Sequence, residues 1–232
     1  MEAVILAGGL GTRLRAAVPD LPKPMAPVAG RPFLEHLMDY WIGQGVSRFI
    51  LSIGYLREVI QGHFGSSYRN VPVSYAVEET PLGTGGGVLL GLAQAQSETV
   101  LVVNGDTFFG VGLLEMQQRH RECNGDLTMA LRSIPHNDRY GTVVLNEQGR
   151  IERFEANPTG GPGIINGGVY LMQRSTLLGL GWQSGAKVAL EQDLFPAMLA
   201  QDHAMCGLVS PGAFIDIGVP DDYYRAATVL PN

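Results

Sequence analysis

The chain has 232 residues, of which 45% are hydrophobic, and a formal net charge of -6 at pH 7. This length suits one α/β domain with a substantial core, and the acidic charge argues against general nucleic-acid binding, which needs a basic face. No basic leader precedes an apolar run, and no run approaches about 18 apolar residues, so we expect no membrane segment. Cys123 and Cys206 are the only cysteines. Two cysteines are too few for a disulfide framework, and this low number favours a reducing cytoplasm.

Short apolar runs alternate with helical patterns in the first half of the chain. The runs are rich in Val, Ile and Leu, as buried parallel strands are, and cover residues 3–6, 49–53, 73–77 and 100–103. Helical spacing between the first two runs predicts an amphipathic helix with the apolar stripe Phe33, Leu34, Leu37, Met38, Trp41 and Ile42. Residues 84–95 predict another helix. This order predicts a doubly wound α/β fold with a mixed, mainly parallel sheet and ligands at the carboxyl ends of its strands.

The second half changes to consecutive strand patterns separated by turns. These patterns cover residues 127–133, 141–145, 150–154 and 167–172, and helices are expected near 190–200 and 220–229. They predict a small antiparallel extension, so that a nucleotide-binding half (1–125) and a sugar-phosphate-binding half (126–232) form a single domain over 1–232. The Gly- and Pro-rich residues 158–163 predict a loop or lid rather than a domain boundary.

The first apolar run leads into a glycine-rich loop, residues 8–14, that carries an arginine. Glycines let backbone N–H groups approach a phosphate closely, and Arg13 and Lys23 add two positive charges beside a polyphosphate. Lysine occurs only at positions 23 and 187 among 16 lysines and arginines, so a flexible point charge stands here in a chain that otherwise uses arginine. The spacing does not fit a P-loop. It also fails the dinucleotide fingerprint at Leu14, which argues against a nicotinamide-dependent oxidoreductase.

Two aspartates stand where a metal would be held beside such a phosphate site. Asp106 directly follows the fourth predicted strand, and Asp216 lies between two isoleucines, where burial is costly unless the carboxylate is paired or binds a metal. Two carboxylates and a polyphosphate form the oxygen environment that Mg²⁺ prefers. We therefore predict that both bind Mg²⁺. The alternatives are an Asx turn at Asp106 and a helix cap at Asp216.

Two further patterns are less specific for a function. Residues 78–87 contain four glycines, which are poor helix starters and suggest a backbone surface against something flat such as a nucleobase; the alternative is a mobile loop. His120 and Cys123 could form half of a metal site. Because no second pair has zinc-ligand spacing, we expect a solvated helix end there.

Together these motifs resemble the sugar-1-phosphate nucleotidyltransferase family over nearly the full chain. The segments that carry the resemblance are 8–14, 22–24, 81–86, 104–109, 139–143, 165–168 and 216–224. Within the family they are most similar to members that transfer a guanylyl group from GTP to D-glycero-D-manno-heptose 1-phosphate for surface polysaccharide synthesis. Members that use mannose 1-phosphate with GTP, or N-acetylmuramate 1-phosphate with a uridine nucleotide, remain alternatives. A non-catalytic nucleotide or sugar-phosphate sensor is a third.

The resemblance implies a role for individual residues. Arg13 and Lys23 would act on the reacting phosphates, Asp106 and Asp216 would hold Mg²⁺, and the sugar phosphate would contact Gly141, Glu155 and Asn166. The nucleotide would contact Leu6, Ala7, Gly8, Gly9, Gly11, Thr12, Arg13, Glu79, Gly83, Thr84, Asn104 and Gly105. The partners are then a nucleoside triphosphate and a sugar 1-phosphate. The C-terminal residues Tyr223, Tyr224, Val229 and Leu230 are candidates for a homodimer contact. The alternative is that they pack in the core.

One departure from the family concerns the sugar-phosphate contact. Many relatives have a lysine directly after the glutamate that corresponds to Glu155, whereas this chain has Ala156. Lys187, Arg139 and Arg153 are the candidate replacements.

Overall fold

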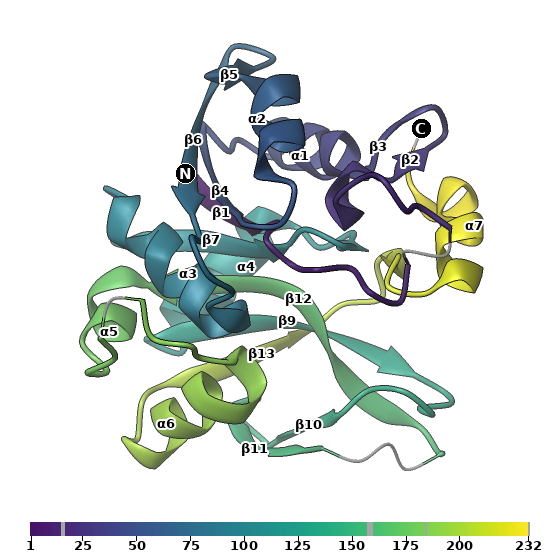
Figure 1. Cartoon of the computed structure of the whole chain (residues 1–232). Helices are drawn as coiled ribbons and strands as arrows, with labels where there is room; N and C mark the ends of the chain where they lie inside the picture. Colours follow the sequence, from purple (N-terminus) through teal and green to yellow (C-terminus); the bar gives the residue numbers. More distant parts are fainter. Residues whose placement is uncertain (15–16, 157–159, 184, 232) are drawn as a thin grey trace.

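The structure is a computed structural model that describes residues 1–14, 17–156, 160–183 and 185–231. The first half alternates strands with helices, as predicted (Figure 1). Its strands are β1 (Glu2–Leu6), β2 (Pro27–Val28), β3 (Arg31–Pro32), β4 (Arg48–Ile53), β5 (Ser67–Tyr68), β6 (Val71–Val77), β7 (Thr99–Asn104) and β8 (Thr107–Phe109). Its helices are the 3₁₀ turn η1 (Lys23–Met25), α1 (Phe33–Gly43), α2 (Arg57–Phe64), α3 (Gly83–Gln94) and α4 (Leu113–Glu122).

The second half contains the predicted run of consecutive strands, followed by helices. The strands are β9 (Leu127–Ile134), β10 (Thr142–Leu145), β11 (Ile151–Glu155), β12 (Gly163–Gln173), β13 (Met205–Val209) and β14 (Phe214–Asp216). The helices are α5 (Arg174–Leu178), the π-helical turn η2 (Leu190–Leu194), α6 (Phe195–Ala200) and α7 (Pro220–Val229). Part of the loop predicted over 158–163 lies outside the described residues.

One mixed sheet of ten strands runs through both halves of the described chain. Its parallel centre has the order β6-β4-β1-β7, so the chain moves outward from β1 in one direction and then returns to pair β7 on the other side of β1. This reversal is the switch point at which doubly wound sheets bind ligands. β12 pairs antiparallel with β7 and with β9, so the predicted antiparallel strands continue this sheet.

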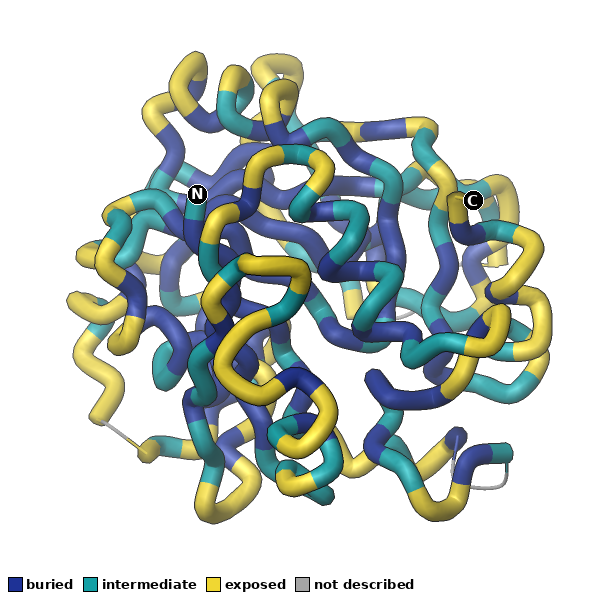
Figure 2. The backbone as a smooth tube through the Cα atoms, turned by 90° about the horizontal axis from the view of Figure 1, so that it is seen from above, coloured by how far each residue is buried: buried dark blue, intermediate teal, exposed yellow. Residues whose placement is uncertain are grey.

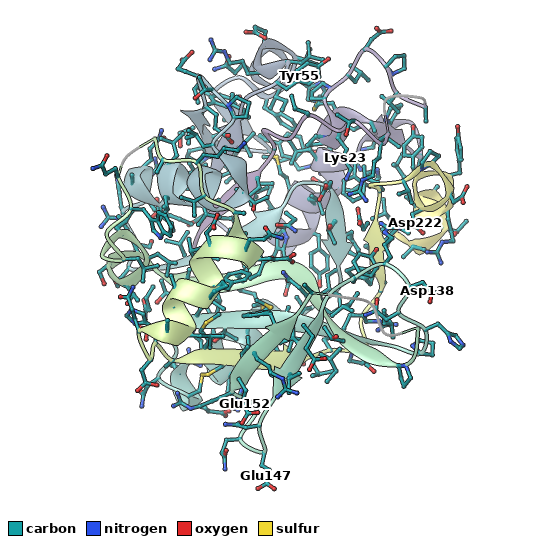
Figure 3. All side chains as sticks on the ribbon, turned by 60° about the horizontal axis from the view of Figure 1, so that its bottom comes forward. Lys23, Tyr55, Asp138, Glu147, Glu152 and Asp222 are labelled. Atoms are coloured by element: carbon teal, nitrogen blue, oxygen red, sulfur yellow. A yellow bond between two sulfur atoms is a disulfide. The ribbon has the colours of Figure 1, made fainter. Side chains whose placement is uncertain are left out.

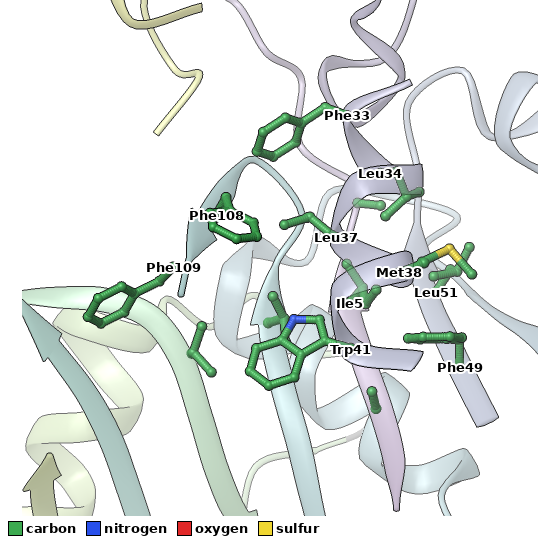
Figure 4. Close-up of a cluster of buried hydrophobic side chains, with 14 of the residues drawn as sticks. Ile5, Phe33, Leu34, Leu37, Met38, Trp41, Phe49, Leu51, Phe108 and Phe109 are labelled. Atoms are coloured by element: carbon green, nitrogen blue, oxygen red, sulfur yellow. The ribbon is translucent and has the colours of Figure 1, made fainter. Parts of the chain in front are cut away.

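Helices cover both faces of the sheet, because successive strand residues point to opposite sides. Ile5 packs with α1, α2 and α4 on one face, whereas Val4 packs with α3, α5 and α6 on the other. The predicted stripe of α1 lies against the first face, with Trp41 and Leu37 at most 1% exposed (Figure 4). Figure 2 shows the buried backbone in the middle of the molecule and the exposed loops around it.

The glycine run after β6 forms the first turns of α3, which confirms the helix predicted over 84–95 even though glycines start helices poorly. Gly83 has φ +76°, and Gly85 and Gly86 are buried against the segment around Val188. The amide of Gly86 donates to the Val188 carbonyl at 3.0 Å, and a Cβ on Gly83 would lie 2.6 Å from that carbonyl oxygen. Close packing against the protein's own backbone therefore outweighs the low helix propensity of glycine.

The expectation of a solvated end to α4 is wrong. His120 is 5% exposed and its Nδ1 lies 2.8 Å from the Thr128 hydroxyl, while burial lowers the pKa of its imidazole. Cys123, at the end of the same helix, forms a disulfide with Cys206 on β13. The low cysteine count therefore gave no guide to this single covalent link between α4 and the sheet, and the disulfide does not support a reducing compartment.

Loss of this disulfide is expected to lower the free energy of unfolding by about 2–4 kcal/mol, because the bond restricts the unfolded chain over a sequence separation of 83 residues. Urea denaturation of the oxidised wild type and of the Cys123→Ala, Cys206→Ala double variant measures the difference. Reductant should destabilise the wild type and leave the variant unchanged. Two titratable thiols in the unfolded, oxidised wild type would contradict the bond.

The C-terminal residues considered for a dimer contact have mixed positions. Leu230 belongs to the buried core, and Tyr223 and Val229 pack against it, which favours the core-packing interpretation for these three. Tyr224 is 71% exposed. Within the described ranges, no helix has both the length and the apolar character needed to cross a membrane.

Candidate active site

Four parallel strands end at the same edge of the sheet. The register places Leu6 at the end of β1 beside Asn104 at the end of β7 and Ser52 near the end of β4. The glycine-rich loop, the Glu78 segment and the Asp106 turn follow these strand ends directly. Gly105 donates its amide to the Leu6 carbonyl at 2.9 Å, and a Cβ there would lie 2.4 Å from that oxygen, so this approach requires glycine.

A cavity of about 440 Å³ opens at this edge and collects most of the predicted nucleotide residues. The predicted residues that line it are Leu6, Gly8, Gly9, Gly11, Thr12, Arg13, Lys23, Gly83, Thr84, Asn104 and Asp106. Further residues that line it belong to segments that the sequence singled out, but they were not among the predicted nucleotide contacts: Leu10, Pro24, Glu78, Pro81 and Gly218. Ala7 does not line the cavity, because it is 1% exposed and donates its amide to the Ser52 carbonyl at 2.7 Å.

Lys23 holds the two predicted metal ligands together. Its Nζ contacts Asp106 Oδ2 and lies 3.6 Å from Asp216 Oδ1, and the lysine side chain is only 11% exposed. Figure 3 labels Lys23 in the upper half of the view, with Asp222 and the yellow C-terminal helix to its right. The turn after β7 carries Asp106, and β14 ends at Asp216, which pairs in register with Thr107 of β8. The β8–β14 pair therefore aligns carboxylates that are far apart in the sequence.

Asp216 also contacts a second cation, Arg139. Arg139 Nη2 lies 2.6 Å from Asp216 Oδ2, and Nη1 lies 2.6 Å from Asp222 Oδ2. Burial opposes the charge on Arg139, but its bonds to Asp222 and Asp216 prevail and raise its pKa. Tyr140 donates to Asp216 Oδ2 at 3.4 Å, and burial together with that carboxylate raises the pKa of the phenol. Asp216 does not cap α7, which begins at Pro220 with Val219 before it.

The donor set suits a magnesium ion that is shared with a phosphate. Asp106 and Asp216 present hard oxygens on either side of one cation, the Lys23 ammonium, so this position already accommodates positive charge. Among the described residues there is no group of three or more acidic, His or Cys side chains placed to hold a metal. Mg²⁺ commonly binds through only one or two carboxylates plus substrate phosphates, so two aspartates fit the ion.

A second cavity of about 360 Å³ adjoins the first and shares Gly8, Leu10, Glu78 and Pro81 with it. Glu79, the predicted base contact, lines only this second cavity, with its side chain 77% exposed and 3.0 Å from Arg57. Glu78 is more enclosed. Its Oε1 accepts from Ser52 Oγ at 3.2 Å and its Oε2 accepts from the Leu82 amide at 3.0 Å.

The three predicted sugar-phosphate residues lie on neighbouring strands outside the first cavity. Gly141 directly precedes β10, and a Cβ there would lie 2.9 Å from the carbonyl oxygen of Glu155, the last residue of β11. Asn166 on β12 donates through Nδ2 to Tyr170 Oη at 2.8 Å and to Glu191 Oε1 at 3.1 Å. Burial raises the pKa of Tyr170. Thr142, which follows Gly141, pairs with Glu155 and with Ile165, so the three residues lie at adjacent positions of β11, β10 and β12.

This arrangement defines a class of enzyme that binds a nucleotide phosphate at the switch point of an α/β sheet and holds two carboxylates beside it. The family model for nucleotidyl transferases matches residues 2–232, and the chain belongs to this family.

Two relatives agree in name and in length. A D-glycero-alpha-D-manno-heptose 1-phosphate guanylyltransferase of Aneurinibacillus thermoaerophilus is 41% identical over 100% of this chain and 99% of its own. One from Campylobacter jejuni is 38% identical, over 97% of this chain and 98% of its own. Among solved structures, HddC from Yersinia pseudotuberculosis complexed with GMP-PN has a TM-score of 0.85 and 32% identity, covering 98% of both chains.

Proposed function

We propose that this chain transfers a guanylyl group from GTP to D-glycero-alpha-D-manno-heptose 1-phosphate and releases pyrophosphate. The observation that carries the proposal is the single cavity in which the glycine-rich loop, Lys23 and Asp106 meet, with Asp216 in contact with the same lysine. The names of the relatives support the choice of GTP and heptose. The product, a GDP-heptose, would serve surface polysaccharide synthesis.

The proposed step is an in-line displacement at the α-phosphorus of the nucleotide. A phosphate oxygen of the sugar 1-phosphate forms the new P–O bond, and pyrophosphate leaves with the electrons of the bond that breaks. This nucleophile is already ionised at neutral pH, so no general base is required. Orientation and charge stabilisation then provide the catalysis. Arg13, Lys23 and the loop amides supply positive charge to the phosphates.

Asp106 and Asp216 are the residues that would hold Mg²⁺. When bound, the ion would neutralise charge on the phosphates and help to orient them. The position of Lys23 between the two carboxylates supports this assignment, since a cation is already favoured there.

We further propose that Glu78 reads the guanine base. The Watson–Crick edge of guanine presents N–H donors, and a carboxylate accepts hydrogen bonds without donating any. Glu78 lines both adjoining cavities, and its bonds to Ser52 and Leu82 fix its orientation.

Glu78→Gln is expected to reduce the preference for GTP over ITP, which lacks the 2-amino group, by about tenfold, because the amide replaces one acceptor with a donor. Rates of pyrophosphate release with the two nucleotides give the ratio. Glu79→Gln is the matched variant and should keep the wild-type ratio. A loss of selectivity only in Glu79→Gln would assign the base contact to Glu79 instead.

Pyrophosphate release with GTP, UTP, CTP, ATP and dTTP against heptose, mannose and N-acetylmuramate 1-phosphates tests the proposal. The proposal requires the highest rate with GTP and the heptose compound. A higher rate with another pair would replace the substrates. Binding of nucleotide without release of pyrophosphate in any pair would favour a sensor.

Location and assembly are also proposals. A cytoplasmic location would give access to nucleoside triphosphates, although the Cys123–Cys206 disulfide does not support it. A homodimer remains a prediction, for which exposed Tyr224 is the remaining candidate among the C-terminal residues considered.

A further inference from the structure

The family resemblance implies a cation beside the sugar phosphate. Many relatives have a lysine directly after the glutamate that corresponds to Glu155, and this chain has Ala156 there. Arg153 is 60% exposed and pairs with Glu155 Oε1 at 3.0 Å, so a neighbouring carboxylate already neutralises it. Neither Lys187 nor Arg139 is among the residues that line the two adjoining cavities. Of the three candidates, Arg139 alone contacts a predicted metal ligand.

Arg139 is held on three sides by the protein. Its guanidinium bridges Asp216 and Asp222, each at 2.6 Å, and its Cζ lies 4.8 Å from the centre of the Tyr140 ring. The side chain is 29% exposed. The guanidinium is therefore accessible from solvent but oriented toward the carboxylate that would take the metal.

Asp216 already accepts three hydrogen bonds. Its Oδ1 accepts from the Gly218 amide at 2.7 Å and lies 3.6 Å from Lys23 Nζ, while Oδ2 accepts from Arg139 and Tyr140. A carboxylate offers about four lone-pair sites. A metal that binds Asp216 Oδ2 therefore competes with Arg139 and Tyr140 for that oxygen.

Arg139 can leave Asp216 without losing its other ion pair. Its Nη1 keeps the bond to Asp222 when Nη2 leaves Asp216, so the guanidinium does not become a partly buried, unpaired charge. Its Nη2 donors are then available to a phosphate, for which the planar guanidinium is well suited.

The position along the chain supports the same partner. Arg139 precedes Gly141 by two residues, and Gly141 lies against Glu155 in the predicted sugar site. A sugar 1-phosphate bound there must direct its phosphate toward the nucleotide cavity and therefore toward Asp216. Arg139 links these two regions, since it contacts Asp216 and precedes Gly141 by two residues.

We propose that Arg139 binds the phosphate of the sugar 1-phosphate in place of the missing lysine, and reaches it by leaving Asp216 when that carboxylate takes the metal. The proposal rests on the proposed nucleotidyl transfer. It makes Arg139 a substrate-binding residue and, before substrate arrives, a competitor of the metal.

Arg139→Gln tests both parts. The KM for the sugar 1-phosphate is expected to rise by at least about tenfold while the KM for GTP stays within about twofold, because only the sugar phosphate loses a charged donor. In the substrate-free protein, electron paramagnetic resonance should show Mn²⁺ binding at least about threefold tighter than in the wild type, since the competing guanidinium is gone. Arg225→Gln is the matched control. Arg225 pairs with Asp222 at 2.8 Å and has no bond to Asp216, so both readouts should stay at wild-type values.

An unchanged KM for the sugar 1-phosphate in Arg139→Gln, or an equal rise in both KM values, would overturn the substrate contact. Unchanged or weaker Mn²⁺ binding would overturn the exchange at Asp216.

If Arg139→Gln does not fold, Arg139→Lys replaces it. A sugar-phosphate KM between wild type and tenfold higher, with an unchanged GTP KM, then supports the contact, and an unchanged sugar-phosphate KM rejects it. A wild type that turns over no sugar 1-phosphate would refute the proposed function, and the Mn²⁺ comparison would still decide the exchange.

Discussion

Asp106→Asn is expected to lower the rate of pyrophosphate release by about 10³-fold, the scale of losing one oriented charge at a reacting centre. The substitution removes the negative charge that contacts Lys23 and one of two carboxylates that would hold Mg²⁺. Asparagine has nearly the same shape, so the turn between β7 and β8 should persist. Steady-state rates at saturating GTP and Mg²⁺, together with circular dichroism, measure both properties.

Asp221→Asn provides the matched control for this loss. Asp221 is exposed in the first turn of α7 and lines neither of the two adjoining cavities. Its rate should stay within about twofold of wild type, because an exposed charge contributes little. A folded Asp106→Asn protein with a near-normal rate would remove Asp106 from the metal site.

Lys23→Gln is expected to lower the rate by about 10²-fold, because the ammonium lies beside the phosphate loop and between both carboxylates. Without it, two carboxylates face one another and repel. Thermal stability should therefore fall in the absence of metal and recover in part when Mg²⁺ is added. Rates of pyrophosphate release and melting temperatures with and without Mg²⁺ measure these effects.

Arg31→Gln is the matched control for Lys23→Gln. Arg31 also forms ion pairs with two carboxylates, but it lies in another part of the molecule. Arg31 bonds Glu35 at 2.8 Å and also contacts Asp39, and it lines neither of the two adjoining cavities. Its melting temperature should fall at every Mg²⁺ concentration, with little change in rate. Identical rates in Lys23→Gln and wild type would exclude Lys23 from the reaction.

The local parts of the fold could be predicted from the sequence because their signals are local. The strands β1, β4, β6 and β7 are short apolar runs, and the stripe of α1 has a clear helical period. The helix over 84–95 was predicted, but the close packing of its first glycines was not, because it depends on Val188, which is distant in the sequence. The disulfide was missed for the same reason, since no sequence pattern brings Cys123 to Cys206.

The sequence indicated which residues belong to the candidate site but not the contacts between them. The position of Asp106 after a strand and the isoleucines around Asp216 pointed to both carboxylates. Their alignment through β8 and β14, and the Lys23 bridge, required the tertiary structure. The sequence pointed to Glu79 as the base contact, whereas our proposal is its neighbour Glu78, because side-chain enclosure cannot be read from adjacent glutamates.

The most direct test of the proposed reaction is ³¹P NMR of the purified protein with GTP, D-glycero-alpha-D-manno-heptose 1-phosphate and Mg²⁺. The account predicts that the GTP and sugar phosphate signals decline together while pyrophosphate and the coupled pair of a sugar diphosphate ester appear in equal amounts. Persistence of both substrates with a protein that binds GTP, or release of inorganic phosphate without a diphosphate ester, would contradict guanylyl transfer.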